Sequence, residues 1–130
     1  MRRMAIAVAL LASLLLPGTA SATSSRCGID VSPAVGSPTD AYRINVSNVP
    51  VDLAGGSVEV RVDVQRTGTR QRSIFFAVLI PGATQFYIDY HVGYPGEPPP
   101  DPLAAGRYRV TAETPHLTGA CHAVGQFEVL

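Results

Sequence analysis

A valine stands at every second position from Val58 to Val64, and this alternation limits the fold more than any other feature of the chain. Charged side chains occupy the positions between these valines, so a strand here has one apolar and one polar face. Beyond residue 22, no segment carries apolar residues at helical spacing over three turns. Strands are also predicted in six further segments, at residues 29–31, 42–47, 73–80, 86–92, 107–113 and 127–129. The sequence therefore predicts an all-β chain with seven strands.

Glycine and proline mark the breaks between these segments. They supply the fixed or positive φ that tight turns need. Such turns are predicted at residues 36–38, 48–50, 55–56, 67–68, 81–82 and 117–119. Seven short strands in about 100 residues, with frequent turns, indicate one domain built as a two-sheet sandwich. The proline-rich stretch Gly96–Pro102 interrupts the pattern, and we expect it to form a stiff polyproline II segment.

The segment Leu103–Val110, with the sequence LAAGRYRV, resembles the run that enters the penultimate strand of immunoglobulin-like and fibronectin-III-like modules. The resemblance implies a seven-stranded immunoglobulin-like sandwich of a bacterial secreted type. It also implies that Tyr108 is a corner tyrosine whose hydroxyl bonds back to the preceding loop. The chain departs from antibody domains, since it has no Trp and no Cys two residues after Tyr108. The inter-sheet disulfide of antibody domains is therefore excluded, and the fold implies no activity of its own.

Residues 1–22 have the features of a secretory signal peptide. Two arginines precede residues 5–16, which are apolar apart from one serine, and Ala20–Ala22 provides a small-residue cleavage site. The apolar stretch is too short to span a bilayer as a helix. We therefore expect cleavage after Ala22 and a single mature domain, residues 23–130, with no membrane span.

The composition of the mature domain bears on its partners and its location. It carries eight arginines against ten acidic residues, since Arg2 and Arg3 leave with the signal, and its net charge is −2. Nucleic-acid binders usually show a basic excess, so no nucleic-acid partner is expected. The basic residues are all arginine, which together with the many alanines indicates a bacterial source. We expect a secreted protein, free outside the cell or held on the envelope by non-covalent contacts.

Cys27 and Cys121 are expected to form a structural disulfide, because exported domains keep such bonds oxidised. The alternative, a reactive redox pair, usually has Cys-x-x-Cys spacing, and the sequence lacks it. In the fold that the resemblance implies, the first strand can run parallel to the last. This arrangement brings the two cysteines together.

No sequence motif points to catalysis. The chain has no Gly-x-Ser-x-Gly elbow, no phosphate-binding loop and no dinucleotide fingerprint. We therefore expect a non-enzymatic protein without a cofactor. Asp89 and His91 are predicted on one face of a strand, and His116 and His122 flank the last turn. Such residues can bind zinc or copper when they converge, so a metal-binding exported protein is kept as an alternative to the expectation of no metal site.

Arg66, Arg70 and Arg72 surround Gly68 at the tip of a predicted hairpin. They can hold a phosphate or an acidic polymer of the envelope. They can also simply keep the hairpin tip soluble, which is the commoner role of such a cluster and the interpretation we prefer.

The run Ser73–Ile80 is apolar on both faces of its predicted strand. Its pairing with the valine strand through a turn of two residues sets Asp63 opposite Arg72, a favourable cross-strand pair. This register places Phe75 in the core. It places a strip of three apolar residues on the other face, consisting of Ile74, Phe76 and Val78.

Two interpretations of this strip stay open. Either Pro98–Pro102 covers it, or it is exposed and binds a partner protein or a second copy of the chain. Coverage is preferred, because an exposed apolar edge invites aggregation. The candidate binding surface is the strip together with four loop residues, namely Tyr94, Pro98, Pro99 and Pro100.

These features predict a secreted, non-enzymatic binding or structural module of the bacterial envelope or exterior. Its partner is an unidentified protein or envelope component. An alternative is a secreted protease inhibitor that presents the stiff loop Gly93–Pro102 to the enzyme.

Overall fold

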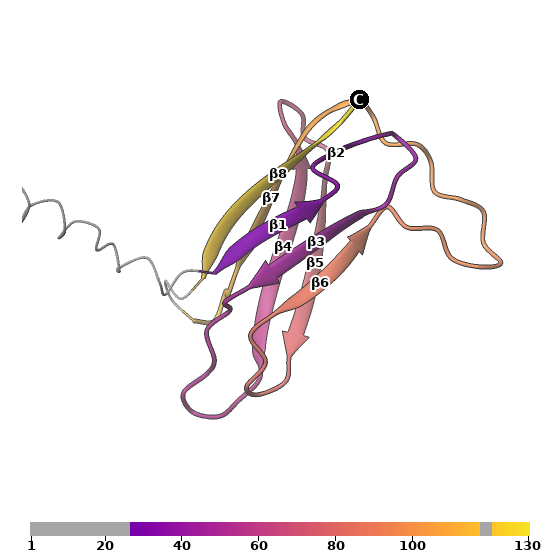
Figure 1. The fold of residues 1–130 in the computed structure, drawn as a ribbon. Helices are drawn as coiled ribbons and strands as arrows, with labels where there is room; N and C mark the ends of the chain where they lie inside the picture. The colour runs from indigo at the N-terminus through magenta and orange to yellow at the C-terminus, as the bar shows by residue number, and fades with distance from the viewer. Residues whose placement is uncertain (1–26, 118–120) are drawn as a thin grey trace, which may run out of the picture.

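The computed structural model describes residues 27–117 and 121–130 (Figure 1). The predicted signal peptide, with its cleavage site after Ala22, lies outside these residues. The described part of the chain holds no helix that is long and apolar enough to cross a membrane. Its eight strands are β1 (Gly28–Ser32), β2 (Val35–Gly36), β3 (Tyr42–Ser47), β4 (Val58–Arg66), β5 (Arg72–Leu79), β6 (Phe86–Tyr90), β7 (Gly106–Glu113) and β8 (His122–Val129).

The strands form two sheets that pack face to face as a β-sandwich (Figure 1). One sheet has the order β1-β3-β6, and the other has the order β2-β8-β7-β4-β5. All paired strands are antiparallel except β2, which runs parallel to β8. The chain passes from the first sheet to the second between β1 and β2. The edge strands are therefore β1 and β6 in one sheet, and β2 and β5 in the other.

All seven predicted strands are present, but the count of seven is wrong by one. The extra strand, β2, is only two residues long and leaves no periodic pattern. The last strand also begins earlier than predicted, at His122 rather than at residue 127. Inward positions in this part of β8 hold Ala123 and Gly125, and Val124 between them is half-exposed. Because the inward residues are small and the outward residue is an apolar valine, this part of β8 lacks the alternation of large apolar and polar residues that identifies a half-buried strand.

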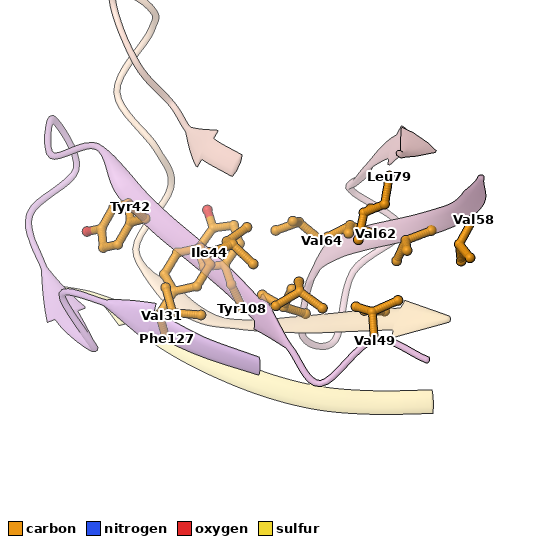
Figure 2. Packing of buried hydrophobic residues seen from close by; sticks show 14 of the residues in the cluster. Val31, Tyr42, Ile44, Val49, Val58, Val62, Val64, Leu79, Tyr108 and Phe127 are labelled. Carbon is orange, nitrogen blue, oxygen red and sulfur yellow. The ribbon is translucent and has the colours of Figure 1, made fainter. Parts of the chain in front are cut away.

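The valines that alternate along β4 all face the space between the sheets, and each is at most 4% exposed. They pack with apolar residues of β3, β7 and β8 into one hydrophobic core (Figure 2). The alternation in the sequence thus predicts correctly which face of β4 is buried.

Phe127 of β8 lies between two tyrosine rings in this core (Figure 2). Its ring centroid is 4.5 Å from that of Tyr42 and 4.9 Å from that of Tyr108. The Tyr108 hydroxyl donates a hydrogen bond of 2.7 Å to the carbonyl oxygen of Ala104, which confirms the corner role that the resemblance implies. The Tyr42 hydroxyl donates in the same way to Ser37, also at 2.7 Å. Both buried hydroxyls are therefore paired, as burial requires.

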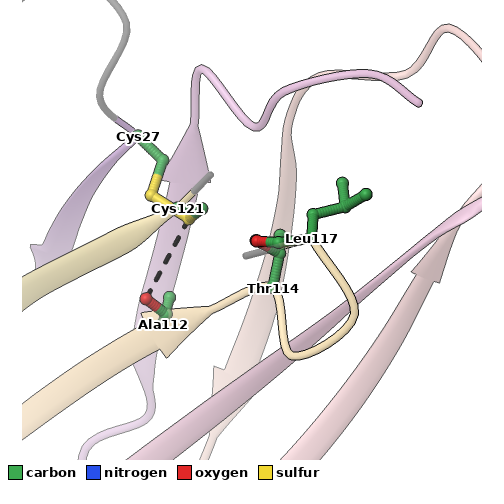
Figure 3. Close-up of a disulfide and its surroundings, with 5 residues drawn as sticks. All are labelled: Cys27, Ala112, Thr114, Leu117 and Cys121. Atoms are coloured by element: carbon green, nitrogen blue, oxygen red, sulfur yellow. Dashed lines mark hydrogen bonds between the residues drawn. A yellow bond between two sulfur atoms is a disulfide. The ribbon is translucent and has the colours of Figure 1, made fainter. Parts of the chain in front are cut away.

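Cys27 and Cys121 form the predicted disulfide (Figure 3). Their Cα atoms are 5.5 Å apart, and the bond links residues 94 positions apart in the chain. Cys27 directly precedes β1 and Cys121 directly precedes β8, so the bond joins the two sheets at one end. The expectation that the first strand runs parallel to the last is confirmed. β1 hydrogen-bonds to β3, but it runs alongside β8 in the same direction, with Cys27 bonded to Cys121 and Ile29 against Gly125, and β2 pairs with β8 in parallel.

Candidate binding surfaces

The edge strand β5 presents an apolar strip to solvent. Ile74, Phe76 and Val78 are 43%, 62% and 66% exposed, and their side chains point away from the core. Phe75 points the other way, packs against the core and meets the ring of Tyr90 edge-on at 6.0 Å. The predicted division of this run between its two faces is therefore confirmed.

The predicted register of the β4–β5 hairpin is wrong by two residues. The turn contains four residues, Thr67–Arg70, and Asp63 pairs with Ile74 rather than with Arg72. A Thr69 hydroxyl bond to the carbonyl of Arg66, at 2.9 Å, supports this longer turn. A shift of two residues preserves which face each side chain occupies, so the strip is unchanged.

The proline-rich loop does not cover the strip, which corrects the preferred interpretation. Its residues from Gly93 to Pro102 are exposed. Its base is tied to the segment between β2 and β3, because Leu103 N–H donates to Pro38 O at 2.8 Å. In Figure 1 the loop extends away from the sheets as an orange arm. Tyr94, Pro98, Pro99 and Pro100 therefore form a surface separate from β5.

His91 holds the same loop in place. The strand β6 ends at Tyr90, and His91 has a left-handed backbone with φ of 63°. Its Nδ1 lies 2.9 Å from the carbonyl oxygen of Asp40, and its Nε2 lies 2.6 Å from that of Asp101. Both ring nitrogens are thus occupied by backbone carbonyls.

The candidate metal ligands do not converge. Asp89 pairs with Arg43, and His91 is held by carbonyl oxygens as described above. His116 lies 3.1 Å from Glu59 on another part of the molecule. Within the described residues, no group of three His, Cys, Asp or Glu side chains is placed to hold a metal ion.

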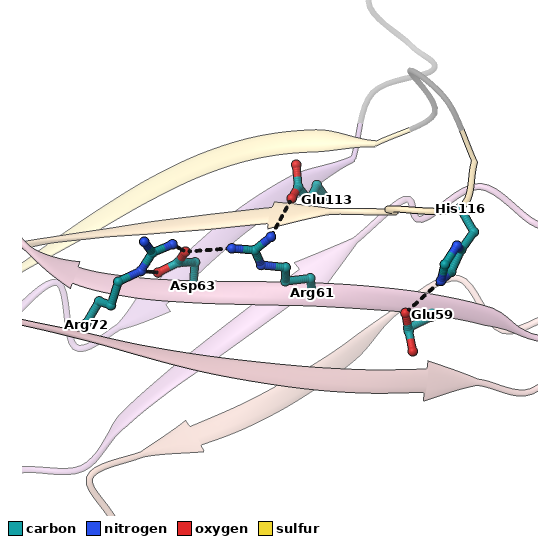
Figure 4. Close-up of polar contacts among 6 residues, drawn as sticks. All are labelled: Glu59, Arg61, Asp63, Arg72, Glu113 and His116. Carbon is teal, nitrogen blue, oxygen red and sulfur yellow. Dashed lines mark hydrogen bonds and ion pairs between the residues drawn. The ribbon is translucent and has the colours of Figure 1, made fainter.

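A chain of ion pairs runs beside the strip on the outer face of the five-stranded sheet (Figure 4). Arg72 binds Asp63 across β5 and β4, and this hydrogen bond raises the pKa of Arg72. Arg61 lies 3.5 Å from Asp63 and 3.5 Å from Glu113 of β7. The strip therefore borders a band in which opposite charges are already paired.

The three arginines near Gly68 do not form a common anion site. Arg66 donates from Nε and Nη2 to the carbonyl oxygen of Ala105, at 3.1 and 2.8 Å. Arg72 is paired with Asp63. Arg70 is exposed at the hairpin tip, and this position fits the solubilising role that we prefer for the cluster.

Sequence reasoning missed a surface on the outer face of the three-stranded sheet. Tyr87 of β6 is 56% exposed there, and the guanidinium carbon of Arg43 lies 3.9 Å from the centroid of its ring. Arg43 also binds Asp89. A signal was present in the sequence, because Tyr87 occupies an outward position of its strand where a polar residue is usual.

Comparisons with known proteins give information on the fold of this chain and none on its function. No protein-family model matches the chain, and no curated protein matches it. A superoxide reductase (neelaredoxin) from Ignicoccus hospitalis has a similar structure, with a TM-score of 0.52, 13% identity, and 86% of each chain covered. A CARDB domain from Pyrococcus furiosus, solved with di-metal ions, has a TM-score of 0.47 at 18% identity, covering 80% of this chain and 90% of that one.

A β-glucosidase from Erythrobacter marinus has a TM-score of 0.49 at 15% identity. The match covers 79% of this chain and 15% of the β-glucosidase. The likeness to the neelaredoxin, the one of these three with a TM-score above 0.5, supports the sandwich fold, and at 13% identity it carries no activity across.

Proposed function

We propose that the mature chain is an exported, non-enzymatic binding module with an immunoglobulin-like fold, and that it assembles with a second copy through the edge of β5. The observation that carries the proposal is the exposure of Ile74, Phe76 and Val78 on an edge strand. Contiguous apolar surface of this kind on a small domain marks an interaction site.

β5 differs from the other edge strands of the sandwich. It has eight residues, whereas β1 and β6 have five each and β2 has two. Natural edge strands are usually short, or carry a charge or a proline that prevents pairing. Between Ser73 and Leu79, β5 has neither a charged residue nor a proline. Its length and composition suit pairing with another strand.

The backbone of β5 presents its free hydrogen-bonding groups at the strip residues. The Arg66 N–H donates to Gln71 O at 3.0 Å, so this pair is a hydrogen-bonded one. Hydrogen-bonded and non-bonded pairs alternate along an antiparallel ladder. Ser73, Phe75 and Ala77 therefore bond toward β4. The residues between them direct their N–H and C=O groups to the open edge.

A second copy fits this edge in an antiparallel, two-fold arrangement centred on Phe76. Phe76 then faces Phe76 of the second copy, and Ile74 faces Val78. Arg72 faces Ile80, so no like charges stand opposite each other. Such an isologous contact closes on itself and gives a dimer rather than a fibre.

The test is the oligomeric state of the mature, disulfide-bonded domain, measured by sedimentation velocity from about 1 μM to about 1 mM. We expect a dimer for the native sequence. Phe76→Ser should give a monomer and should cost little free energy of unfolding, because its side chain is largely exposed in the monomer. A native protein that stays monomeric at about 1 mM, or a Phe76→Ser variant that still dimerises, would overturn the proposal.

Phe75→Ser is the matched control for this experiment. It removes a half-buried aromatic ring of the same strand that packs against the core, and its truncation should cost part of the about 3–5 kcal/mol that a fully buried Phe costs. This variant should lose stability in the monomer, which separates a packing defect from a lost interface.

A second candidate function, protease inhibition, is favoured by the way in which the loop Gly93–Pro102 is held. His91 lies between the carbonyl oxygens of Asp40 and Asp101, so the loop is exposed but fixed at its base. A loop ordered before binding loses little entropy in a protease cleft. Dose-dependent inhibition of a panel of secreted proteases, abolished by cleavage within the loop, would identify this function.

A further inference from the structure

A second binding surface lies on the outer face of the β1-β3-β6 sheet, on the opposite side of the sandwich from the β5 strip. Tyr87 pairs with Asn45 across β6 and β3, and Asp89 pairs with Arg43. Because side chains alternate along each strand, these four side chains project outward on the same face. They place an aromatic ring among polar groups on a rigid sheet.

Arg43 fixes the position of the Tyr87 ring. Its guanidinium carbon lies 3.9 Å from the ring centroid, within the range of a cation–π contact. The same guanidinium donates from Nε and Nη2 to the two carboxylate oxygens of Asp89, at 2.8 and 3.1 Å. This hydrogen bonding lowers the pKa of Asp89. The ring is therefore supported by a side chain that is itself held in place, and a ligand need not order either group.

An open hollow of about 500 Å³ adjoins this ring, a volume typical of ligand sites. Its lining consists of Asn45, Val46, Ser47, Gln85, Phe86 and Tyr87. Arg43 lies against the ring of Tyr87 and is not among the residues that line the hollow.

The side chains that line the hollow are neutral. Asn45 and Gln85 each offer an amide that both donates and accepts hydrogen bonds, and Ser47 offers a hydroxyl. On the same face of the sheet, Arg43 and Asp89 pair with each other, and the exposed Asp30 of β1 stands opposite Asn45. The lining itself carries no charge with which an anion or a cation could pair, and a carboxylate such as that of Asp30 can accept a hydrogen bond from a hydroxyl.

This combination fits a sugar ring. A pyranose has an apolar face of C–H groups, which packs on an aromatic ring. Its rim carries hydroxyls, each of which donates and accepts, and these match amides and a serine hydroxyl. We propose that the hollow beside Tyr87 binds a neutral sugar unit of an oligosaccharide or polysaccharide. The site shares no residue with the β5 interface, so a result that overturns one proposal leaves the other unaffected.

The proposal is tested with the mature, disulfide-bonded domain and four neutral probes, namely cellohexaose, laminarihexaose, maltohexaose and chitohexaose. Binding is measured by calorimetry and located by amide shifts in NMR spectra. We expect at least one probe to bind and to shift the amides of Asn45, Ser47, Gln85 and Tyr87.

Tyr87→Ala should weaken that binding about tenfold, because it removes the stacking surface. Tyr94→Ala is the matched control, since Tyr94 is a tyrosine of similar exposure, 63%, on the proline-rich loop. It should leave the affinity unchanged. The proposal is overturned if no probe shifts the amides around the hollow, or if Tyr94→Ala weakens binding as much as Tyr87→Ala does.

Discussion

Gly125 of β8 lies directly against Ile29 of β1, and a methyl group at residue 125 would stand 2.7 Å from Cγ2 of Ile29. These two strands belong to opposite sheets, so the contact limits how closely the sheets approach. It lies in the part of the sandwich that the disulfide closes, where Cys27, Cys121 and Ala123 form a small cluster with Ile29. Glycine is needed here for the close approach, and not for an unusual backbone angle.

Gly125→Ala is therefore expected to destabilise the domain by about 1–3 kcal/mol, as added bulk in a packed interior does. Urea unfolding followed by circular dichroism measures the loss. Gly28→Ala is the control, because a Cβ at residue 28 meets Ser47 Oγ at an ordinary 3.7 Å. Equal stability of the two variants would show that the sheets separate easily at this point.

The fold follows closely from the sequence where one face of a strand is buried. The valines of β4 and the position of Phe75 were predictable because a period of two fixes which side chains share a face. The length of the β4–β5 turn was not predictable, since loops of two and four residues give the same parity. The ion pair between Arg72 and Asp63 forms nevertheless, as a diagonal contact between neighbouring strands.

The candidate sites are harder to predict from the sequence than the buried faces of the strands. An apolar strip on β5 can be deduced from Ser73–Ile80 alone, but its exposure depends on where the proline-rich loop goes. That direction is set by contacts with Pro38 and Asp40, more than 50 residues away from the loop tip. The hollow beside Tyr87 likewise joins β3 and β6, whose pairing no local pattern reveals.

Tyr108→Phe is expected to lower the free energy of unfolding by about 1–2 kcal/mol, because it leaves the carbonyl of Ala104 without its buried donor. Tyr42→Phe should have a similar effect through Ser37. Chemical denaturation of each variant measures both losses. Tyr94→Phe serves as the control, since its side chain is largely exposed, and it should be neutral. If Tyr108→Phe is also neutral, the hydroxyl bond contributes nothing to stability.

Removal of the disulfide is expected to destabilise the domain strongly. The bond spans 94 residues, and in the chain-entropy model a loop of that length is worth roughly 4–5 kcal/mol. The double variant Cys27→Ser, Cys121→Ser should therefore melt at a much lower temperature in a calorimetric scan. In the native protein, thiol reagents should modify neither cysteine unless a reductant is added. Labelling of both without reductant would contradict the bond.

The domain is expected to lose stability as the solution becomes alkaline, because two buried tyrosines resist ionisation. Burial is the largest cause that raises the pKa of both Tyr42 and Tyr108 above the ordinary value of 10.0. In the unfolded chain each tyrosine releases its proton near the ordinary pKa, whereas in the folded domain it stays neutral to higher pH. The stabilisation is thus complete below about pH 10 and declines as the pH rises through the pKa of the folded state.

Urea unfolding at a series of pH values from about 8 to 11.5 measures this decline. The double variant Tyr42→Phe, Tyr108→Phe lacks both ionisable hydroxyls, and its disulfide-bonded cysteines do not titrate. It should be less stable than the native protein at pH 8 but should lose stability less steeply above pH 10. Identical slopes for the two proteins would mean that other groups cause the alkaline loss, and that these hydroxyls ionise as readily in the folded domain as in the unfolded chain.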